Sequence, residues 1–486
     1  MMRTHSTEPL PGADIRADLR LGYIWIISFV ASLGGLLFGY DWVVIGGAKP
    51  FYEVYFQLSS EAQIGWANSC ALLGCFAGSL LAGPGADKFG RKRFLLISAF
   101  LFAVSSILTG WAHSFGGFIF WRITGGLAIG LASNISPMYI AEISPAQWRG
   151  RLVSLNQLAI VIGILTAQLV NWRIAESIPV ESHEIVLASS WNAQYGWRWI
   201  FTAVAGPAVL FLCSAPFIPE SPRWLAGRRN VRAARDVLKR IGGQHYAQSE
   251  LSAIQNSVGV LHESAGWREL SSSPGNKLLA IGAALAVLQQ WSGINILFNY
   301  AQEVYHSAGY GVSEILFNIV ITGTINLIFT IIAMLLVDRF GRRRLMIFGC
   351  IAIGASHLAA SMAYRSHAQG KWVLVLTLCA IACYAMSLAP VTWVLLTEVF
   401  PNRMRASAVS VSVAILWVAS FVLTYTFPLL NQSLGTSGAF LIYAGICFAG
   451  AVFVSIAVRE TKGRSLEALE EAPPTIDLAG GAVTPD

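Results

Sequence analysis

Long apolar runs recur along the whole chain and are separated by short polar or charged segments. Each run holds about 20 residues, the length that an α-helix needs to cross a ~30 Å hydrocarbon core. The pattern predicts twelve membrane-spanning helices, at residues 21–46, 64–86, 94–113, 117–141, 152–172, 196–218, 278–302, 315–337, 345–364, 372–397, 406–430 and 436–458. We therefore expect an all-α, multi-pass membrane protein.

Lysine and arginine concentrate in alternate connections between these runs. Membrane proteins keep such residues on the cytoplasmic side, so the charge pattern places both termini, in the tails 1–20 and 459–486, in the cytoplasm. The formal net charge of +7 therefore reports topology, and we do not expect nucleic-acid binding. The basic connections are 87–93, 149–151, 223–240, 339–344, 403–405 and 459–464.

The composition narrows the class of protein further. Hydrophobic residues make up 55% of the chain and charged residues only 12%, which argues against a soluble globular protein. The seven cysteines all fall in the predicted helices and lack zinc-type or disulfide-framework spacing. There is no phosphate-binding glycine loop, metal-ligand cluster or nucleophile–base pair with recognisable spacing. We therefore expect neither an enzyme nor a metal or cofactor site.

The second half of the chain repeats charged motifs of the first half. DKFGRKR at 87–93 returns as DRFGRRR at 338–344, an offset of 251. Glu142 and Arg149 return as Glu398 and Arg405 at an offset of 256, and Glu220 has a weaker echo in Glu460. A repeat of this length predicts two six-helix bundles in parallel orientation, with the substrate site between them. The predicted bundles span 21–218 and 276–458, joined by a small cytoplasmic helical insertion at 219–275.

The stretch QQWSGINILFNY, at residues 289–300, is unusually polar for a membrane segment. Side-chain amides inside a membrane are costly unless they find partners, so they usually face a bundle interior or a water-filled cavity. Neutral groups that both donate and accept hydrogen bonds suit an uncharged, hydroxyl-rich ligand. The alternative, that these amides only link helices, stays open at this point.

Six motifs together identify a family. GGLLFGYD (34–41), the paired DxFGRxR loops, PMYIAEISPAQWRG (137–150), PESPRW (219–224), QQWSGIN (289–295) and TEVFPNRMRA (397–406) resemble the sugar porter family of the major facilitator superfamily. Within it, the chain is similar to bacterial xylose–proton and glucose–proton symporters and to facilitative glucose transporters. The resemblance covers residues 22–465 and implies a monomeric carrier in the lipid bilayer of a bacterial inner cell membrane, which moves a monosaccharide by alternating access.

The resemblance also implies the residues that hold the sugar. Amides pair with vicinal hydroxyls, and an indole covers the apolar face of a pyranose ring. The implied substrate-binding residues are Gln157, Gln289, Gln290, Asn295, Asn299, Asn326, Trp393 and Trp417. The chain departs from its relatives at Asn299, where they usually have a tyrosine, at Leu416, where they have an amide, and at Trp42, where they have a small residue. These departures leave the sugar open.

Asp41 and Arg122 decide between coupled and uncoupled transport. Both fall inside predicted helices, about five residues from the outer ends, and ionisable residues there usually form a pair or a pathway. A carboxylate stays ionised beside an arginine and takes up a proton when the two separate. Since proton-coupled relatives carry the aspartate, we predict a sugar:proton symporter, with the proton as coupling ion. The alternatives are a snorkelling carboxylate in a facilitative uniporter, or a sensor that binds sugar without transporting it.

Charged residues at the cytoplasmic ends form two matched sets. Carboxylates at helix ends facing arginines in neighbouring loops can tie the bundles together when the carrier faces outward, and weak exposed pairs suit a reversible tie. The alternative is charge that only sets topology. The predicted gate residues are Asp87, Arg91, Glu142, Arg149, Glu220 and Arg223 in the first set, and Asp338, Arg342, Glu398, Arg405 and Glu460 in the second.

Overall fold

The structure is a computed structural model that describes residues 19–176, 188–258, 273–366, 370–401 and 404–460. Within these ranges, side chains are described except at 256–258, 273–274, 337–339, 397 and 406. Most of the two predicted tails, 1–20 and 459–486, and the side chain of Asp338 therefore lie outside the described residues. The described chain is helical and contains no β-strand.

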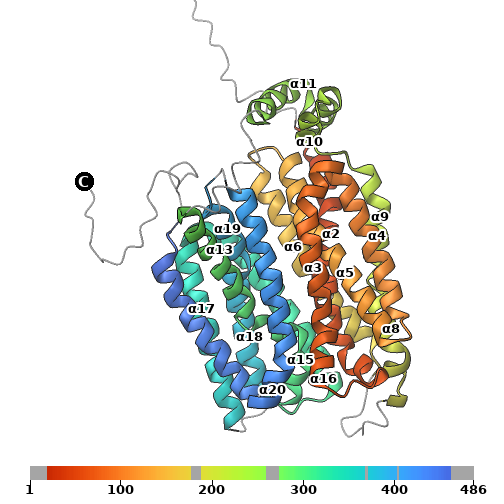
Figure 1. Cartoon of the computed structure of the whole chain (residues 1–486), viewed down its shortest axis with the longest axis vertical. Helices are drawn as coiled ribbons and strands as arrows, with labels where there is room; N and C mark the ends of the chain where they lie inside the picture. The colour runs from red at the N-terminus through yellow and green to blue at the C-terminus, as the bar shows by residue number, and fades with distance from the viewer. Residues whose placement is uncertain (1–18, 177–187, 259–272, 367–369, 402–403, 461–486) are drawn as a thin grey trace, which may run out of the picture.

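The N-terminal half forms one bundle of six crossings (Figure 1). Five of them are single helices, and the sixth is assembled from short consecutive helical pieces. The elements are α2 (Leu21–Tyr55), α3 (Glu61–Phe89), α4 (Arg91–Gly110), α5 (Phe115–Ile143) and α6 (Arg149–Ile174), followed by η1 (Asn192–Gly196), α8 (Trp197–Thr202), α9 (Ala205–Ser214) and η2 (Ala215–Phe217).

The C-terminal half forms the second bundle. Its elements are α13 (Ser273–Trp291), α14 (Ile294–Asn299), α15 (Ala301–His306), α16 (Val312–Phe340), α17 (Arg342–Arg365), α18 (Lys371–Met386), α19 (Leu388–Glu398) and α20 (Arg405–Ala457). The described residues hold 11 helical segments long and apolar enough to cross a membrane. One of them, α20, is 53 residues long and is interrupted at Gly435 (φ 68°, ψ 170°), so it crosses twice. The predicted fold of twelve crossings in two six-helix bundles is confirmed.

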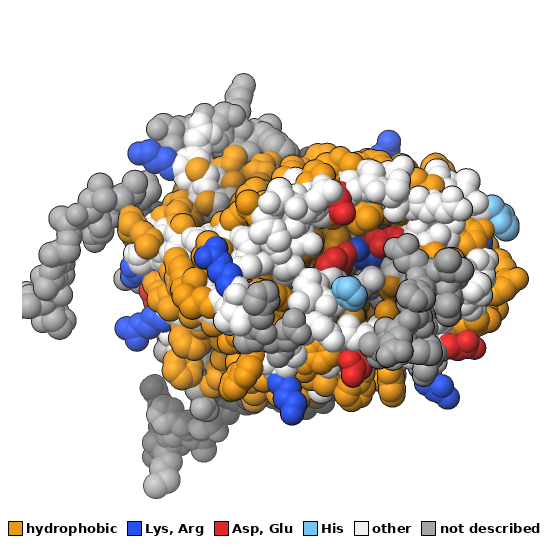
Figure 2. Space-filling view, turned by 90° about the horizontal axis from the view of Figure 1, so that it is seen from below, with side chains coloured by type: hydrophobic (Ala, Val, Ile, Leu, Met, Phe, Trp, Pro, Cys, Tyr) orange, Lys and Arg blue, Asp and Glu red, His pale blue; other side chains and the backbone are white. Residues whose placement is uncertain are grey.

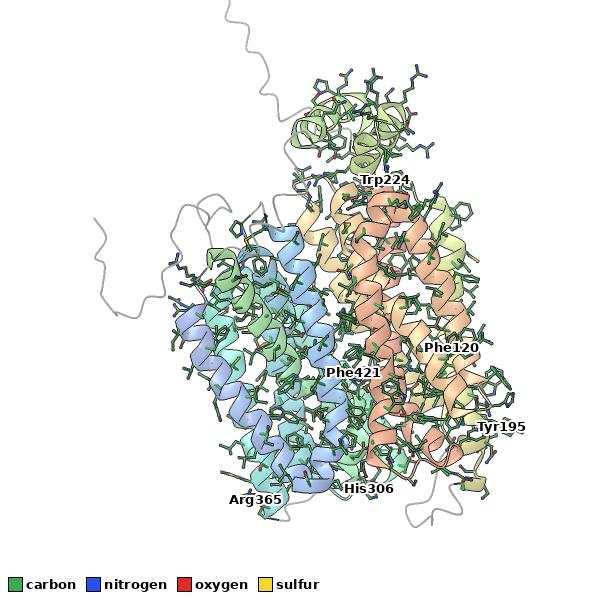
Figure 3. The ribbon with its side chains drawn as sticks, in the orientation of Figure 1. Phe120, Tyr195, Trp224, His306, Arg365 and Phe421 are labelled. Carbon is green, nitrogen blue, oxygen red and sulfur yellow. The ribbon has the colours of Figure 1, made fainter. Side chains whose placement is uncertain are left out.

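The insertion between the bundles consists of α10 (Pro222–Gly227) and α11 (Val231–Val258), which cap one end of the molecule (Figure 1). We call this the insertion end and the opposite one the far end. The Trp224 indole fixes α10 to the N-terminal bundle by donating to the Asp87 carbonyl oxygen at 2.8 Å. Figure 3 shows Trp224 at the insertion end and His306 at the far end.

Three predicted helices have different limits in the structure. The first was expected to end at residue 46, but α2 continues through Pro50 to Tyr55. The predicted helix 278–302 is interrupted after Trp291, where Gly293 adopts φ 83°, and the predicted helix 372–397 is interrupted at Ser387. Apolar length alone does not reveal such breaks, because broken membrane helices are as hydrophobic as continuous ones.

The bundles approach each other closely in their far halves. There, α2 contacts α14 and α15, and α3 contacts α20. A Cβ on Gly46 would lie 2.6 Å from the Phe298 carbonyl oxygen, and one on Gly65 would overlap the Tyr425 carbonyl oxygen. Near Gly65, Trp66 packs edge-on against Phe421, which Figure 3 shows between the two bundles. Only glycine allows backbones this close, so the far end is closed by direct helix contact.

Candidate functional site

The break between α13 and α14 lies at the centre of the candidate site. A helix break inside a membrane frees backbone carbonyls, which need new partners. Here the Ser292 carbonyl oxygen accepts from Nε2 of the buried His357 at 2.8 Å, and the Trp291 indole donates to the Ala419 carbonyl oxygen on α20 at 2.9 Å. These contacts hold the turn in place, so the amides on both sides of it point to fixed positions.

The amides around this turn form a directed chain of hydrogen bonds. Asn295 Nδ2 donates to Gln290 Oε1, Gln290 Nε2 donates to Gln289 Oε1 at 2.6 Å, and Gln289 Nε2 donates to the Tyr384 hydroxyl at 2.8 Å. All three amides are buried. Each NH₂ group has a second hydrogen and each amide oxygen a second lone pair, so the chain keeps bonding capacity for a hydroxylated ligand.

Aromatic rings from α2 and α20 meet across the boundary between the bundles. The indole of Trp417 on α20 is 1% exposed, and its Nε1 has no hydrogen-bond partner among the described residues. The Phe38 and Trp42 rings of α2 lie 5.8 Å and 5.9 Å from it, measured between ring centroids. The unusual Trp42 therefore packs on a predicted sugar-binding residue, across the boundary between the bundles.

Asp41 and Arg122 are brought together by α2 and α5. Arg122 Nη1 donates to Asp41 Oδ1 at 3.0 Å, and the two side chains are 5% and 4% exposed. The second carboxylate oxygen, Oδ2, has no partner in the described part of the chain. The expectation that Asp41 lies near the end of its helix is wrong, because α2 runs 14 residues beyond it to Tyr55.

A small cavity joins this ion pair to the second bundle. It is lined by Asp41, Arg122 and Trp42, by Asn68 of α3, and by Asn299 of α14. The Asn68 and Asn299 side-chain oxygens have no hydrogen-bond partner in the ranges that the structure describes. Asn299 therefore belongs to the surroundings of the ion pair and lies on α14, the helix that also carries Asn295 of the amide chain.

Three predicted substrate residues are not joined to the amide chain. Gln157 on α6 and Trp393 on α19 are half-buried, and Asn326 on α16 is buried. Among the described hydrogen bonds, none links these three side chains to Gln289, Gln290 or the other members of the chain. Their part in a site stays a prediction.

The charged residues at the insertion end form ion pairs within each bundle. In the first set, Arg91 lies 2.8 Å from Asp87 and 3.1 Å from Glu142, and its backbone N–H donates to Glu220 at 3.0 Å. In the second set, Arg342 Nε lies 3.7 Å from Glu398, and its backbone N–H donates to Glu460 at 2.9 Å. The repeated motifs thus build the same arrangement twice. In each, a carboxylate lies at the start of a helix, α4 or α17, where its negative charge interacts favourably with the positive end of the helix dipole.

The other members of the two sets have separate contacts. Arg149 donates to the Ala141 carbonyl oxygen and Arg405 to the Phe400 carbonyl oxygen, each within its own bundle. Arg223 is exposed. The predicted tie between the bundles at this end is not tested by these contacts and stays a prediction.

Sequence reasoning missed two residues that build the site. Tyr384 ends the amide chain, and His357 supports the helix break. Each is an isolated polar residue within a predicted apolar helix, a signal shared by many membrane side chains that have no ligand. Their partners lie in other helices, so spacing along the sequence could not connect them to Gln289 or Ser292.

Comparison with known proteins identifies the family. The sequence model of the family described as "Sugar (and other) transporter" matches residues 27–472. The chain belongs to the sugar transporter family. This transporter is 36% identical over 479 residues to the D-xylose-proton symporter of Escherichia coli strain K12, covering 92% of the chain and 95% of the relative. It is 38% identical over 458 residues to a glucose transport protein of Synechocystis, covering 92% and 96%.

Solved structures support the same fold for the transporter. The partially occluded, inward open structure of the xylose transporter XylE from E. coli matches with a TM-score of 0.80 at 35% identity, covering 91% of this chain and 100% of that one. The fold and the family are those of a membrane carrier, so the expectation that this protein is not an enzyme is confirmed.

Proposed function

We propose that this transporter is a sugar:proton symporter that imports a pentose or hexose by alternating access. The observation that carries the proposal is the arrangement around Asn299: the cavity at the Asp41–Arg122 pair reaches α14, the helix that carries Asn295 of the buried amide chain. A neutral polar array and a single ion pair on opposite sides of the bundle boundary suit a neutral sugar and one coupling ion. Relatives named as D-xylose-proton and arabinose-proton symporters support the assignment.

In this proposal the amide chain and the aromatic rings bind the sugar. Gln289, Gln290 and Asn295 offer their remaining donors and acceptors to ring hydroxyls. Trp417 offers one N–H and an apolar face, which suits the C–H face of a pyranose. Gln157, Asn326 and Trp393 complete the site when the bundles move, since none of the described hydrogen bonds joins them to the amide chain in the present state.

Asp41 carries the proton in the proposed cycle. In the ion pair, the Arg122 guanidinium binds Oδ1 of the carboxylate, while Oδ2, which has no partner among the described residues, leaves one oxygen for a proton. When Arg122 moves away, a bare carboxylate in this buried place is costly, so Asp41 takes up a proton. Since Asn299 lies in the same cavity, sugar binding and protonation share one boundary between the bundles.

The proposed orientation places the insertion end in the cytoplasm. Alternate basic connections support it, and so does the basic character of α10 and α11. The far end then faces outside. Since the glycine contacts of α2 and α3 close that end, the state described here is the one closed to the outside. We further propose that the boundaries 21–218, 219–275 and 276–458 are those of the moving parts.

Sugar-induced proton uptake tests the proposal. Purified transporter in proteoliposomes with a weakly buffered exterior is given xylose, arabinose, glucose or galactose in turn. We expect the exterior to become more alkaline with at least one pentose or hexose. Rapid counterflow of radiolabelled sugar without a pH change would instead indicate a uniporter, and neither response from folded protein would contradict the proposed function.

Neutralising the insertion-end carboxylates should shift the carrier toward its inward-facing state. The changes are Glu142→Gln and Glu398→Gln, which remove carboxylates that we expect to form pairs between the bundles in the outward-facing state; in the present state they pair within their own bundles. Because such pairs contribute about 0–1 kcal/mol, we expect shifts of up to about fivefold. The measurement is thiol labelling from each side of the membrane, with Lys88→Gln as a control because that exposed side chain forms no ion pair among the described residues. A shift toward the outward-facing state would contradict the gate assignment.

A further inference from the structure

A buried lysine lies near the far end of α2, at the boundary between the bundles. Lys49 is 1% exposed, its Nζ lies 3.1 Å from Glu53 Oε1, and it also contacts Glu303. Glu53 belongs to the same helix, four residues on, whereas Glu303 belongs to α15 in the other bundle. Figure 2 looks onto this end and shows acidic side chains gathered around a basic one in a hollow.

The two carboxylates give Lys49 a partner in more than one state. A buried ammonium left without a counter-charge is strongly disfavoured. If the bundles part, Glu303 moves away with α15, but Glu53 stays beside Lys49 because both lie on α2. The contact between Lys49 and Glu303 can therefore break without leaving the lysine unpaired, and this makes it reversible.

This ion pair lies beside the segment that joins the sugar site to the Asp41 cavity. The Lys49 ammonium lies 5.1 Å from the centroid of the Tyr300 ring, and the Tyr300 hydroxyl donates to the Thr424 carbonyl oxygen at 2.6 Å. Tyr300 directly follows Asn299, which lines the cavity. Three residues before Lys49, Gly46 contacts the Phe298 carbonyl oxygen. One face of α2 thus holds residues 298–303 at two neighbouring points.

We infer that Lys49 and Glu303 are positioning residues of the transport cycle, forming an outer latch that holds residues 298–303 against α2 while the far end is closed. The latch breaks when sugar is admitted from outside, and its closing returns Asn299 to the Asp41 cavity. The inference rests on the proposed alternating-access function. It differs from the insertion-end gate in position, in its residues and in the state that it stabilises.

A cysteine that is buried only while the latch is closed reports its state. Thr424, on α20, is 1% exposed and lies next to Tyr300, so Thr424→Cys is a near-isosteric reporter. Intact cells or oriented proteoliposomes are treated from outside with a membrane-impermeant maleimide, without sugar. The parent chain, which keeps its native cysteines, gives the background. Adding Lys49→Gln or Glu303→Gln should raise the labelling rate roughly five- to tenfold, because both remove the link between the bundles.

The matched control is Glu53→Gln. It removes a carboxylate from the same cluster, but Glu53 and Lys49 lie on one helix, so the link between the bundles is kept. We expect its labelling rate not to rise, because without Glu53 the open state would leave Lys49 without a counter-charge. Equal labelling in Glu53→Gln and Glu303→Gln would show that the cluster acts through its net charge alone, and would overturn the latch.

A charge exchange supplies the second test. Combining Lys49→Glu with Glu303→Lys keeps one ammonium and two carboxylates in the cluster, so labelling should return to the rate of the reporter alone. Failure of a folded double variant to restore this rate, or unchanged labelling in both single variants, would overturn the inference. Labelling is read without sugar, so it separates failure of the latch from failure of the proposed symport, which the pH assay detects by itself.

Discussion

Asp41→Asn is expected to abolish accumulation of sugar against its gradient while counterflow of the same sugar continues. The amide keeps the shape of the side chain and a hydrogen bond from Arg122 to its oxygen, but it carries neither the charge nor the transferable proton. A one-unit pH gradient coupled to one proton supports about a tenfold sugar ratio, since tenfold corresponds to about 1.4 kcal/mol. The variant should reach only equal concentrations on both sides.

Two assays on the same preparation check this expectation. Uptake of labelled sugar is followed under an imposed pH gradient, and counterflow is followed without one. Asp236→Asn is the control, because that exposed aspartate on α11 lies outside both proposed sites and its removal should leave accumulation intact. If Asp41→Asn still concentrated sugar, another group would have to carry the proton, and Asp41 would have only a structural role.

The repeat in the sequence predicted equivalent hydrogen bonds in the two bundles. Glu220 and Glu460 lie 240 residues apart, and each accepts a backbone N–H at the start of an equivalent helix. The glycines before these helices, Gly90 and Gly341, have matching φ values of 101° and 87°. The hydrogen-bonded partners lie 129 and 118 residues apart, so local spacing does not pair them. The correspondence between the bundles is readable because the same motifs recur in both halves.

The limits of α2 could not be read from the sequence. Lys49 and Pro50 look like the start of a loop, since a charge and a proline usually end an apolar run. In the structure the charge is balanced by Glu53 and by Glu303, which lies in the other bundle. Only the three-dimensional arrangement supplies that second carboxylate, so the pattern along the chain placed Asp41 too close to the helix end.

The polar stretch 289–300 was recognised, but its organisation was not. Four amides, a serine and a glycine marked it as a site, whereas the direction of the hydrogen bonds depends on the break at Gly293. That break is stabilised by His357 from α17. Distant helices thus decide which amide atoms are used within the protein and which remain for a ligand.

Gln290→Ala is expected to weaken sugar binding by about 100-fold. Gln290 is the middle member of the amide chain, so its loss removes both the acceptor of Asn295 Nδ2 and the donor to Gln289 Oε1. A buried polar group left without a partner costs about 1–3 kcal/mol, and a 100-fold change corresponds to about 2.7 kcal/mol. The dissociation constant can be measured by calorimetry on detergent-solubilised protein, with the sugar that gives proton uptake.

Tyr384→Phe is the matched control at the end of the same chain. It removes only the hydroxyl that accepts from Gln289 Nε2, and leaves the contacts of Gln290 in place. We expect a loss of affinity below about tenfold, because a single hydrogen bond contributes about 0.5–1.5 kcal/mol. If both variants lost affinity equally while keeping the parent's thermal stability, the chain would act by fixing the helix break. A much larger loss for Gln290→Ala means that the middle amide meets the sugar. Only that variant leaves a donor, Asn295 Nδ2, and an acceptor, Gln289 Oε1, both without their partner.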